Sequence, residues 1–84
     1  MADPDERMIG TADFSVTVWG PNSGGGYGVY VKDGVVWHHH YGDAAGGSDD
    51  DWRRQDPAAY ALGHAEQPRH RDVVIWLRAR GLCP

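Results

Sequence analysis

The chain has few of the residues that mark several classes of protein. Among its 84 residues there are one cysteine, one phenylalanine and one lysine, and no apolar run approaches the ~18–20 residues of a membrane-spanning helix. The single cysteine, Cys83, cannot form an intramolecular disulfide, so nothing points to an oxidising compartment. No apolar leader follows Met1, which makes the cytoplasm the expected location and gives no reason to expect a membrane partner.

Large aliphatic residues are also scarce. Leu, Ile, Val and Phe supply fourteen of the 84 residues, below the ~20% at which disorder is expected if the net charge is high. The net charge is only −4, and four Trp and four Tyr add apolar area, so the composition indicates a folded domain with a small, aromatic-rich core. Such a thin core leaves self-association as a homodimer, or a partner, to supply further burial.

The first segments differ in pattern. Residues 1–11 are acidic and aperiodic, which predicts a flexible acidic tail followed by one small domain over residues 12–84. Phe14, Val16 and Val18 alternate with other residues, and this period of two predicts a strand at about 13–19. The Gly-rich run at 20–26 predicts a flexible connection.

The next segment predicts a β-hairpin. Asp33 and Gly34 separate two alternating segments, 27–32 and 35–41, and Asp-Gly is the pair that a type I′ turn favours. Counting outward from this turn pairs Lys32 with Val35 and, at the far end, Tyr27 with His40. One face then carries Tyr27, Val29, Val31, Val36, His38 and His40, and the other carries Tyr30, Lys32, Val35, Trp37, His39 and Tyr41. The valine-rich face is the expected core side.

Helix signals follow a second Gly-rich stretch. Ser48 with Asp51 resembles a capping box that opens a short helix including Trp52 and Arg53. Asp56 before Pro57 predicts a second helix start. The arrangement predicts α+β: a three-stranded antiparallel sheet packed on one face by two or three short carboxyl-terminal helices, near residues 49–66 and 70–80.

The last predicted helix has an apolar face made by Val73, Val74 and Leu77. Gly81 predicts a Schellman ending that brings Leu82 back onto Leu77. The β-branched residues at 73–77 leave a strand as the alternative. Cys83 follows in an expected mobile tail with no base placed beside it, so it is not a candidate nucleophile.

Two histidines suggest a metal site as an alternative function. His38 and His40 lie two apart on a strand, so both side chains point to one face and are close enough to share a zinc-type ion. A third ligand would have to come from His64, His70, Asp43 or Asp72, none of which has an identifying spacing. The simpler interpretation is that these histidines border the core and bind no cofactor.

Charge is distributed unevenly along the chain. Residues 1–51 sum to −7 and residues 52–84 to +3. A second alternative is therefore nucleic-acid binding by the carboxyl-terminal arginines, with Trp76 or Trp52 stacking on bases. The acidic pI of about 5.6 argues against it. The arginines concerned are Arg69, Arg71, Arg78 and Arg80, together with His70.

No set of acids, bases and nucleophiles can be assembled from the sequence, so the leading hypothesis is a non-enzymatic protein-interaction module. Its expected anchors are the aromatic sheet face and a nearby acidic group that selects a partner with a basic surface. An accessory inhibitor from a phage or mobile element, which blocks a nucleic-acid-handling complex, is the type of protein that this combination suggests. The predicted partner-binding residues are Tyr30, Trp37, His39, Tyr41, Trp19, Asp43, Asp49, Asp50 and Asp51.

Overall fold

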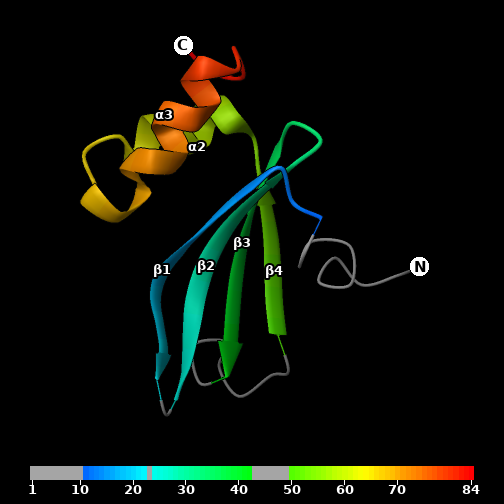
Figure 1. Ribbon diagram of the computed structural model, residues 1–84, viewed down its shortest axis with the longest axis vertical. Helices are drawn as coiled ribbons and strands as arrows, with labels where there is room; N and C mark the ends of the chain where they lie inside the picture. Colours follow the sequence, from blue (N-terminus) through cyan, green and yellow to red (C-terminus); the bar gives the residue numbers. More distant parts are fainter. Residues whose placement is uncertain (1–10, 23, 43–49) are drawn as a thin grey trace.

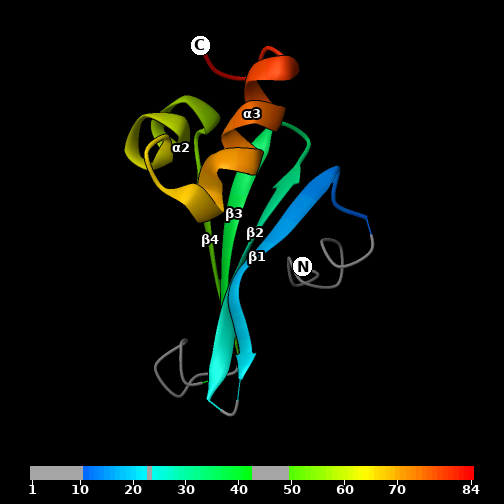
Figure 2. The same ribbon diagram turned by 60° about the vertical axis from the view of Figure 1, so that its left-hand side comes forward.

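The computed structural model describes residues 11–22, 24–42 and 50–84. They form an antiparallel sheet in the order β1-β2-β3-β4, followed by helices. Figures 1 and 2 show the helices on one face of the sheet, near the β2–β3 turn, with the opposite strand ends extending past them. The predicted α+β class is confirmed. The elements are β1 (Phe14–Asn22), β2 (Gly25–Lys32), β3 (Val35–Gly42), β4 (Asp50–Gln55), α2 (Pro57–His64), the 3-10 helix η2 (Pro68–His70) and α3 (Arg71–Ala79).

The predicted hairpin register is confirmed. Asp33 and Gly34 have φ angles of 51° and 78°, the positive values that a type I′ turn requires. The pairs run without a shift from Lys32 opposite Val35 to Tyr27 opposite His40, and on to Gly25 opposite Gly42. Because this register has no irregularity, it determines which face each side chain of β2 and β3 occupies.

The number of strands is a correction to the prediction. Residues 50–55 were expected in a short helix opened by Ser48, but Asp50–Gln55 forms a fourth strand that pairs with β3. The segment has no apolar stripe for a helix to bury, and in the strand Trp52 lies opposite His39. Long-range pairing therefore outweighs the local capping signal. Residues 43–49, which include Asp43, Ser48 and Asp49, lie outside the described residues.

The prediction for the Gly-rich run at 20–26 also needs a correction. Strand β1 continues to Asn22 and β2 begins at Gly25, so most of the predicted flexible connection is strand. The pairing shifts between Thr17 and Trp19 and again between Trp19 and Asn22. Gly20 and Gly25 have positive φ, which lets the chain pass through these irregularities without Cβ strain. The expected tail falls, apart from Thr11, outside the described part of the chain.

The core lies between the sheet and the helices, as the valine-rich face predicts. Its fully buried side chains come from both layers, and Phe14 packs against this core by stacking on Trp76 with ring centroids 5.4 Å apart. Cys83 is also buried in this core, so the expected mobile tail is wrong at that position. The largest fully buried residues are Val29, Val31, Val36, Tyr60, Val73, Val74 and Leu77.

The helix ends follow the sequence signals. Asp56 caps α2, because its Oδ2 accepts a hydrogen bond from the Ala59 amide at 3.2 Å. Residues 71–79 are helical, which removes the strand alternative. After α3, Gly81 has φ of 73° and the Leu82 amide donates to the Leu77 carbonyl at 3.0 Å, as a Schellman ending requires. Within the described residues, no helix is long and apolar enough to cross a membrane.

Two glycine substitutions test the backbone assignment at the helix ends. Gly81→Ala should lower the free energy of unfolding by about 1 kcal/mol, because alanine is strained at positive φ. Gly63→Ala is the matched control, since Gly63 is exposed within α2 with open space around it, and it should raise stability by about 0.5–1 kcal/mol. Urea unfolding followed by circular dichroism measures both. A change of the same sign in the two variants contradicts the cap.

Candidate functional site

The three consecutive histidines of β3 are divided between the two faces of the sheet. His38 pairs with Val29 and His40 with Tyr27, so both point toward the helices. His39 points to the opposite side, which we call the outer face. Its neighbours there come from three strands, with Gly28 and Trp52 as its direct cross-strand partners. The division into two faces is the one expected from the hairpin register.

On the outer face, aromatic rings gather around His39. The His39 ring stacks on Trp52 with centroids 3.9 Å apart and planes 10° apart, and lies 5.1 Å from the Tyr41 ring. Tyr30 completes the group at 5.3 Å from Trp52 and 6.1 Å from His39. Packing of this kind leaves His39 only 5% exposed although no described helix covers it. The outer aromatic cluster is defined as Tyr30, His39, Tyr41 and Trp52.

Two glycines of β2 make room for this cluster. Gly26 and Gly28 are buried and point to the outer face. A Cβ atom at Gly26 would collide with the Tyr41 hydroxyl and ring, and one at Gly28 would meet the Val16 carbonyl at 3.2 Å and the Tyr30 ring at 3.5 Å. The missing side chain at Gly26 makes room for the Tyr41 ring over β2, and the one at Gly28 leaves space beside Val16 and Tyr30. Sequence reasoning missed this role, because Gly26 was assigned to a flexible connection and Gly28 was placed in a strand without a role of its own.

The outer aromatic cluster contains unpaired polar atoms. The Asp50 Oδ2 atom lies 3.4 Å from His39 Nε2, yet neither ring nitrogen of His39 has a hydrogen bond of good geometry within the described residues. The buried indole nitrogen of Trp52 likewise has no hydrogen-bond partner within the described residues. Buried polar atoms are normally satisfied, and leaving one without a partner costs about 1–3 kcal/mol. The outer aromatic cluster therefore differs from an ordinary apolar patch.

Beneath the helices a second group forms, the inner histidine cluster, defined as His38, His64 and His70 with Tyr27 and Tyr60. The Tyr27 hydroxyl lies 2.6 Å from His38 Nδ1, and His38 Nε2 lies 2.8 Å from Gln55 Oε1. The Tyr60 hydroxyl lies 2.7 Å from His70 Nδ1, while its carbonyl accepts from His64 Nδ1 at 2.8 Å. The first two contacts join β2, β3 and β4, the last two join α2 to η2 and to itself, and the two sets meet where the His38 and His64 rings lie 5.7 Å apart.

Burial favours the neutral imidazole at two members of the inner histidine cluster, His38 and His70. It lowers the pKa of His70 to about 4, an effect to which His64 and His38 add, and it lowers the pKa of His38, partly offset by the bond to Gln55. Burial also raises the pKa of Tyr27 to about 12 and raises that of Tyr60. The tyrosines therefore keep their protons, and each hydroxyl can donate to an unprotonated imidazole nitrogen.

Three of the histidines considered for a metal site, His38, His64 and His70, lie close together, but each already has a hydrogen-bond partner. His64 and His70 have ring centroids 4.4 Å apart, and His38 and His64 5.7 Å. Both nitrogens of His38 already have partners, and His40 stacks on Tyr27 at 4.3 Å. Among residues 11–22, 24–42 and 50–84, no three His, Cys, Asp or Glu side chains are arranged to hold a metal ion. Asp72 is exposed on α3, and Asp43 lies outside the described residues.

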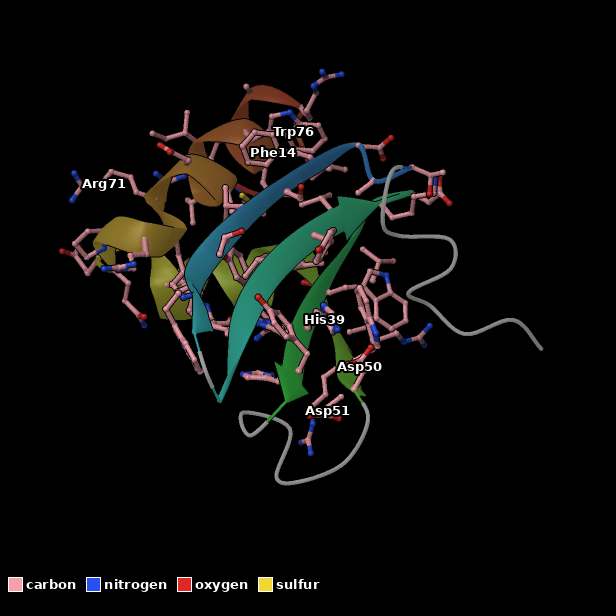
Figure 3. The ribbon with its side chains drawn as sticks, turned by 60° about the horizontal axis from the view of Figure 1, so that its bottom comes forward. Phe14, His39, Asp50, Asp51, Arg71 and Trp76 are labelled. Carbon is pink, nitrogen blue, oxygen red and sulfur yellow. The ribbon has the colours of Figure 1, made fainter. Side chains whose placement is uncertain are left out.

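Three of the four carboxyl-terminal arginines make contacts within the described residues. Arg69 Nη1 donates to the Val18 carbonyl at 2.6 Å, and Arg78 Nε donates to the Pro84 carbonyl at 3.0 Å. The Arg80 guanidinium lies over the Trp76 ring at 4.8 Å, and that ring is stacked on Phe14. Figure 3 shows Arg71 projecting away from the Phe14–Trp76 pair. Arg69, Arg78 and Arg80 thus contact three different parts of the chain.

The predicted partner-binding residues are only partly brought together. Tyr30, His39 and Tyr41 join in the outer aromatic cluster, and Trp37 lies on the same face opposite Tyr30. The register places Trp19 opposite Tyr27, on the helix side. Trp52, which sequence reasoning placed in a helix, is the main ring beside His39. The alternation Asp50, Trp52, Arg54 was the signal that could have found it.

The acidic residues are divided in the same way. Asp50 lies opposite Tyr41 on the outer face, and Asp51 lies opposite His40 on the helix side, where its Oδ2 accepts from Arg53 Nε at 2.9 Å. Both carboxylates lie near the lower end of β4 in Figure 3. Asp49 and Asp43 fall outside the described residues. The expectation that Asp50 and Asp51 lie in a short helix is wrong, because both are in strand β4.

No protein-family model, curated protein or solved structure matches this chain.

The inner histidine cluster predicts loss of stability in mild acid. A histidine whose folded-state pKa is lowered binds fewer protons folded than unfolded, so its stabilisation is full above pH 6.5 and is lost as pH falls toward 4. The urea midpoint should fall across this window. His70→Gln keeps polar atoms beside Tyr60 but does not titrate, so its midpoint should depend less on pH. An equally steep pH dependence in this variant contradicts the assignment.

Proposed function

We propose that the chain is a non-enzymatic protein-interaction module that binds its partner on the outer face of the sheet. The observation that carries the proposal is the outer aromatic cluster, which lies on a sheet face that no described helix or strand covers (Figure 2). Contiguous aromatic surface of this kind is characteristic of interaction sites. Tyr and Trp are also the residue types that dominate binding energy at protein interfaces.

The outer face offers anchors of different accessibility. His39 is buried at the centre of the cluster, whereas Tyr30, Trp37, Tyr41 and Trp52 are half-buried and surround it. A partner side chain would therefore contact the rim of rings first, while His39 and Gly26 keep that rim in place from below. Rings already held by stacking lose little conformational freedom on binding, which favours affinity.

The proposed preference for a basic partner now rests on Asp50. Asp50 is exposed and lies on the outer face, whereas Asp51 faces the helix side and is paired with Arg53. Lys32 and Arg54 share the outer face with Asp50, so the local charge is mixed. The aromatic contribution is accordingly the main part of the proposal. Inhibition of a nucleic-acid-handling complex is a narrower form of it and depends on the charge contribution.

The placement of the titratable side chains supports a non-enzymatic role. The closest imidazole–hydroxyl pairs are structural: His38 with Tyr27 joins β3 to β2, His70 with Tyr60 joins η2 to α2, and burial lowers the pKa of both imidazoles. A pocket of about 320 Å³ reaches His70, whose pKa burial lowers to about 4, and no Asp, Glu, Cys or second His is among the described residues that line it. Its lining is Val18, Gln67, Pro68, Arg69 and His70. General acid–base catalysis needs such groups within reach of a substrate.

Affinity capture with matched variants tests the proposal. Trp37→Thr with Tyr41→Thr removes two outer-face rings and keeps strand propensity, so it should abolish capture of the proteins that the wild-type chain retains. Ile75→Thr with Leu62→Thr is the control, because these two apolar residues are exposed on the helices. The control should capture the same proteins as wild type. Circular dichroism establishes that each variant is folded.

Unchanged capture by the folded Trp37 and Tyr41 variant would contradict the use of the outer face. The charge contribution is tested separately with Asp50→Asn, which should weaken capture if the partner is basic. Equal capture by this variant removes the basic-partner part and leaves the aromatic part intact.

A further inference from the structure

Strand β4 is a regular edge of the sheet. It pairs with β3 on one side, and on the other side no described strand pairs with it. The opposite edge, β1, is interrupted by two register shifts, the type of irregularity with which proteins protect an edge from further pairing. The β3–β4 pairing runs from Val36 opposite Gln55 to Tyr41 opposite Asp50 without a shift. Of the two edges, β4 is therefore better suited to accept another strand.

The charges along β4 are self-complementary. Asp50 and Asp51 precede Trp52, and Arg53 and Arg54 follow it. In an antiparallel pair of two copies centred on Trp52, Asp50 lies opposite Arg54 of the other copy and Asp51 opposite Arg53. Each pair shares a face, because Asp50, Trp52 and Arg54 point to the outer face and Asp51 and Arg53 to the helix side. All four charged residues are at least partly exposed and can reach across the edge.

Other registers bring like charges together. Centring the pair on Asp51 places Asp51 against its own copy, and centring it on Arg53 does the same for Arg53. An in-register parallel pair also aligns like charges. Directly opposed like charges are destabilising in sheets, whereas opposed unlike charges are stabilising. Charged edge residues ordinarily discourage pairing, but here their order favours one partner in one register.

We propose that two copies of this chain associate through β4, antiparallel and centred on Trp52, to form a continuous sheet across a two-fold axis. A two-fold axis makes every contact occur twice, so the Asp50–Arg54 pair and the Asp51–Arg53 pair each form twice. The described helices pack on one face and not along the edge of β4, so they leave this edge accessible (Figure 1). The Trp52 rings of the two outer aromatic clusters then lie side by side.

The proposed dimer goes beyond the proposed function and does not depend on it. It uses the backbone edge of β4, whereas the proposed partner uses the outer face, and the two surfaces share Asp50 and Trp52. The Arg53–Asp51 contact within one strand competes with the new pairs, but Arg53 stays on the same face and can serve either carboxylate. The N–H and C=O groups along the β4 edge add hydrogen bonds between the two copies, and these do not depend on which carboxylate Arg53 contacts.

Two charge variants of the full chain provide the test, with mass measured by light scattering after size exclusion. The wild type should elute at twice the 9.2 kDa chain mass and dissociate as salt is raised. Asp50→Arg with Asp51→Arg makes the strand wholly basic, and Arg53→Asp with Arg54→Asp makes it wholly acidic. Each alone should raise the dimer dissociation constant at least about tenfold, whereas an equimolar mixture should form a heterodimer.

The control carries Ser15→Lys with Thr17→Lys on the β1 edge and should remain dimeric. A monomeric wild type at high protein concentration, or variants that stay dimeric alone, would overturn the proposal. Circular dichroism confirms folding, and recovery of the dimer on mixing cannot come from misfolded chains. Loss of the dimer with retained capture of a partner by the Arg53→Asp and Arg54→Asp variant, which keeps Asp50 and the outer-face rings, would separate this proposal from the proposed function.

Discussion

The alternation of side chains across β3 is the constraint on which the rest of the molecule depends. The Asp33–Gly34 turn fixes the register, and the register sends His38 and His40 to one face and His39 to the other. A slip of one residue would bury the outer rings under the helices and expose Val36. The inner histidine cluster and the outer aromatic cluster therefore both result from the alternation of side chains along β3. A single short turn determines both the core and the candidate binding surface.

The same sheet solves the problem of a sequence with few large aliphatic residues. On the helix side, valines and Leu77 form a conventional core, extended by imidazoles and phenols that bond to one another. On the outer side, rings stack over glycine positions and bury His39 without help from another described layer. Aromatic residues therefore perform two tasks, because stacked rings bury area even where no second layer lies above them.

Sequence reasoning succeeded where short-range physics decides the structure. The hairpin, the Asp56 cap, the Gly81 ending and the valine-rich core face all follow from local turn chemistry or periodicity. It failed where contacts with residues distant in the sequence determine the secondary structure. Ser48 and Asp51 resemble a helix cap, but pairing of Trp52 with His39 makes the segment a strand. The gathering of His64 and His70 beside His38 likewise depends on how the helices pack, which spacing along the chain does not encode.

The burial of Cys83 gives the molecule an internal reporter. Its thiol is in the core beside the end of α3, and the chain has no other cysteine. Because only 9% of Cys83 is exposed, a thiol reagent should label it faster when the carboxyl-terminal segment detaches, so the rate of labelling follows local opening. The native sequence thus contains a probe that separates fraying of this segment from unfolding of the sheet.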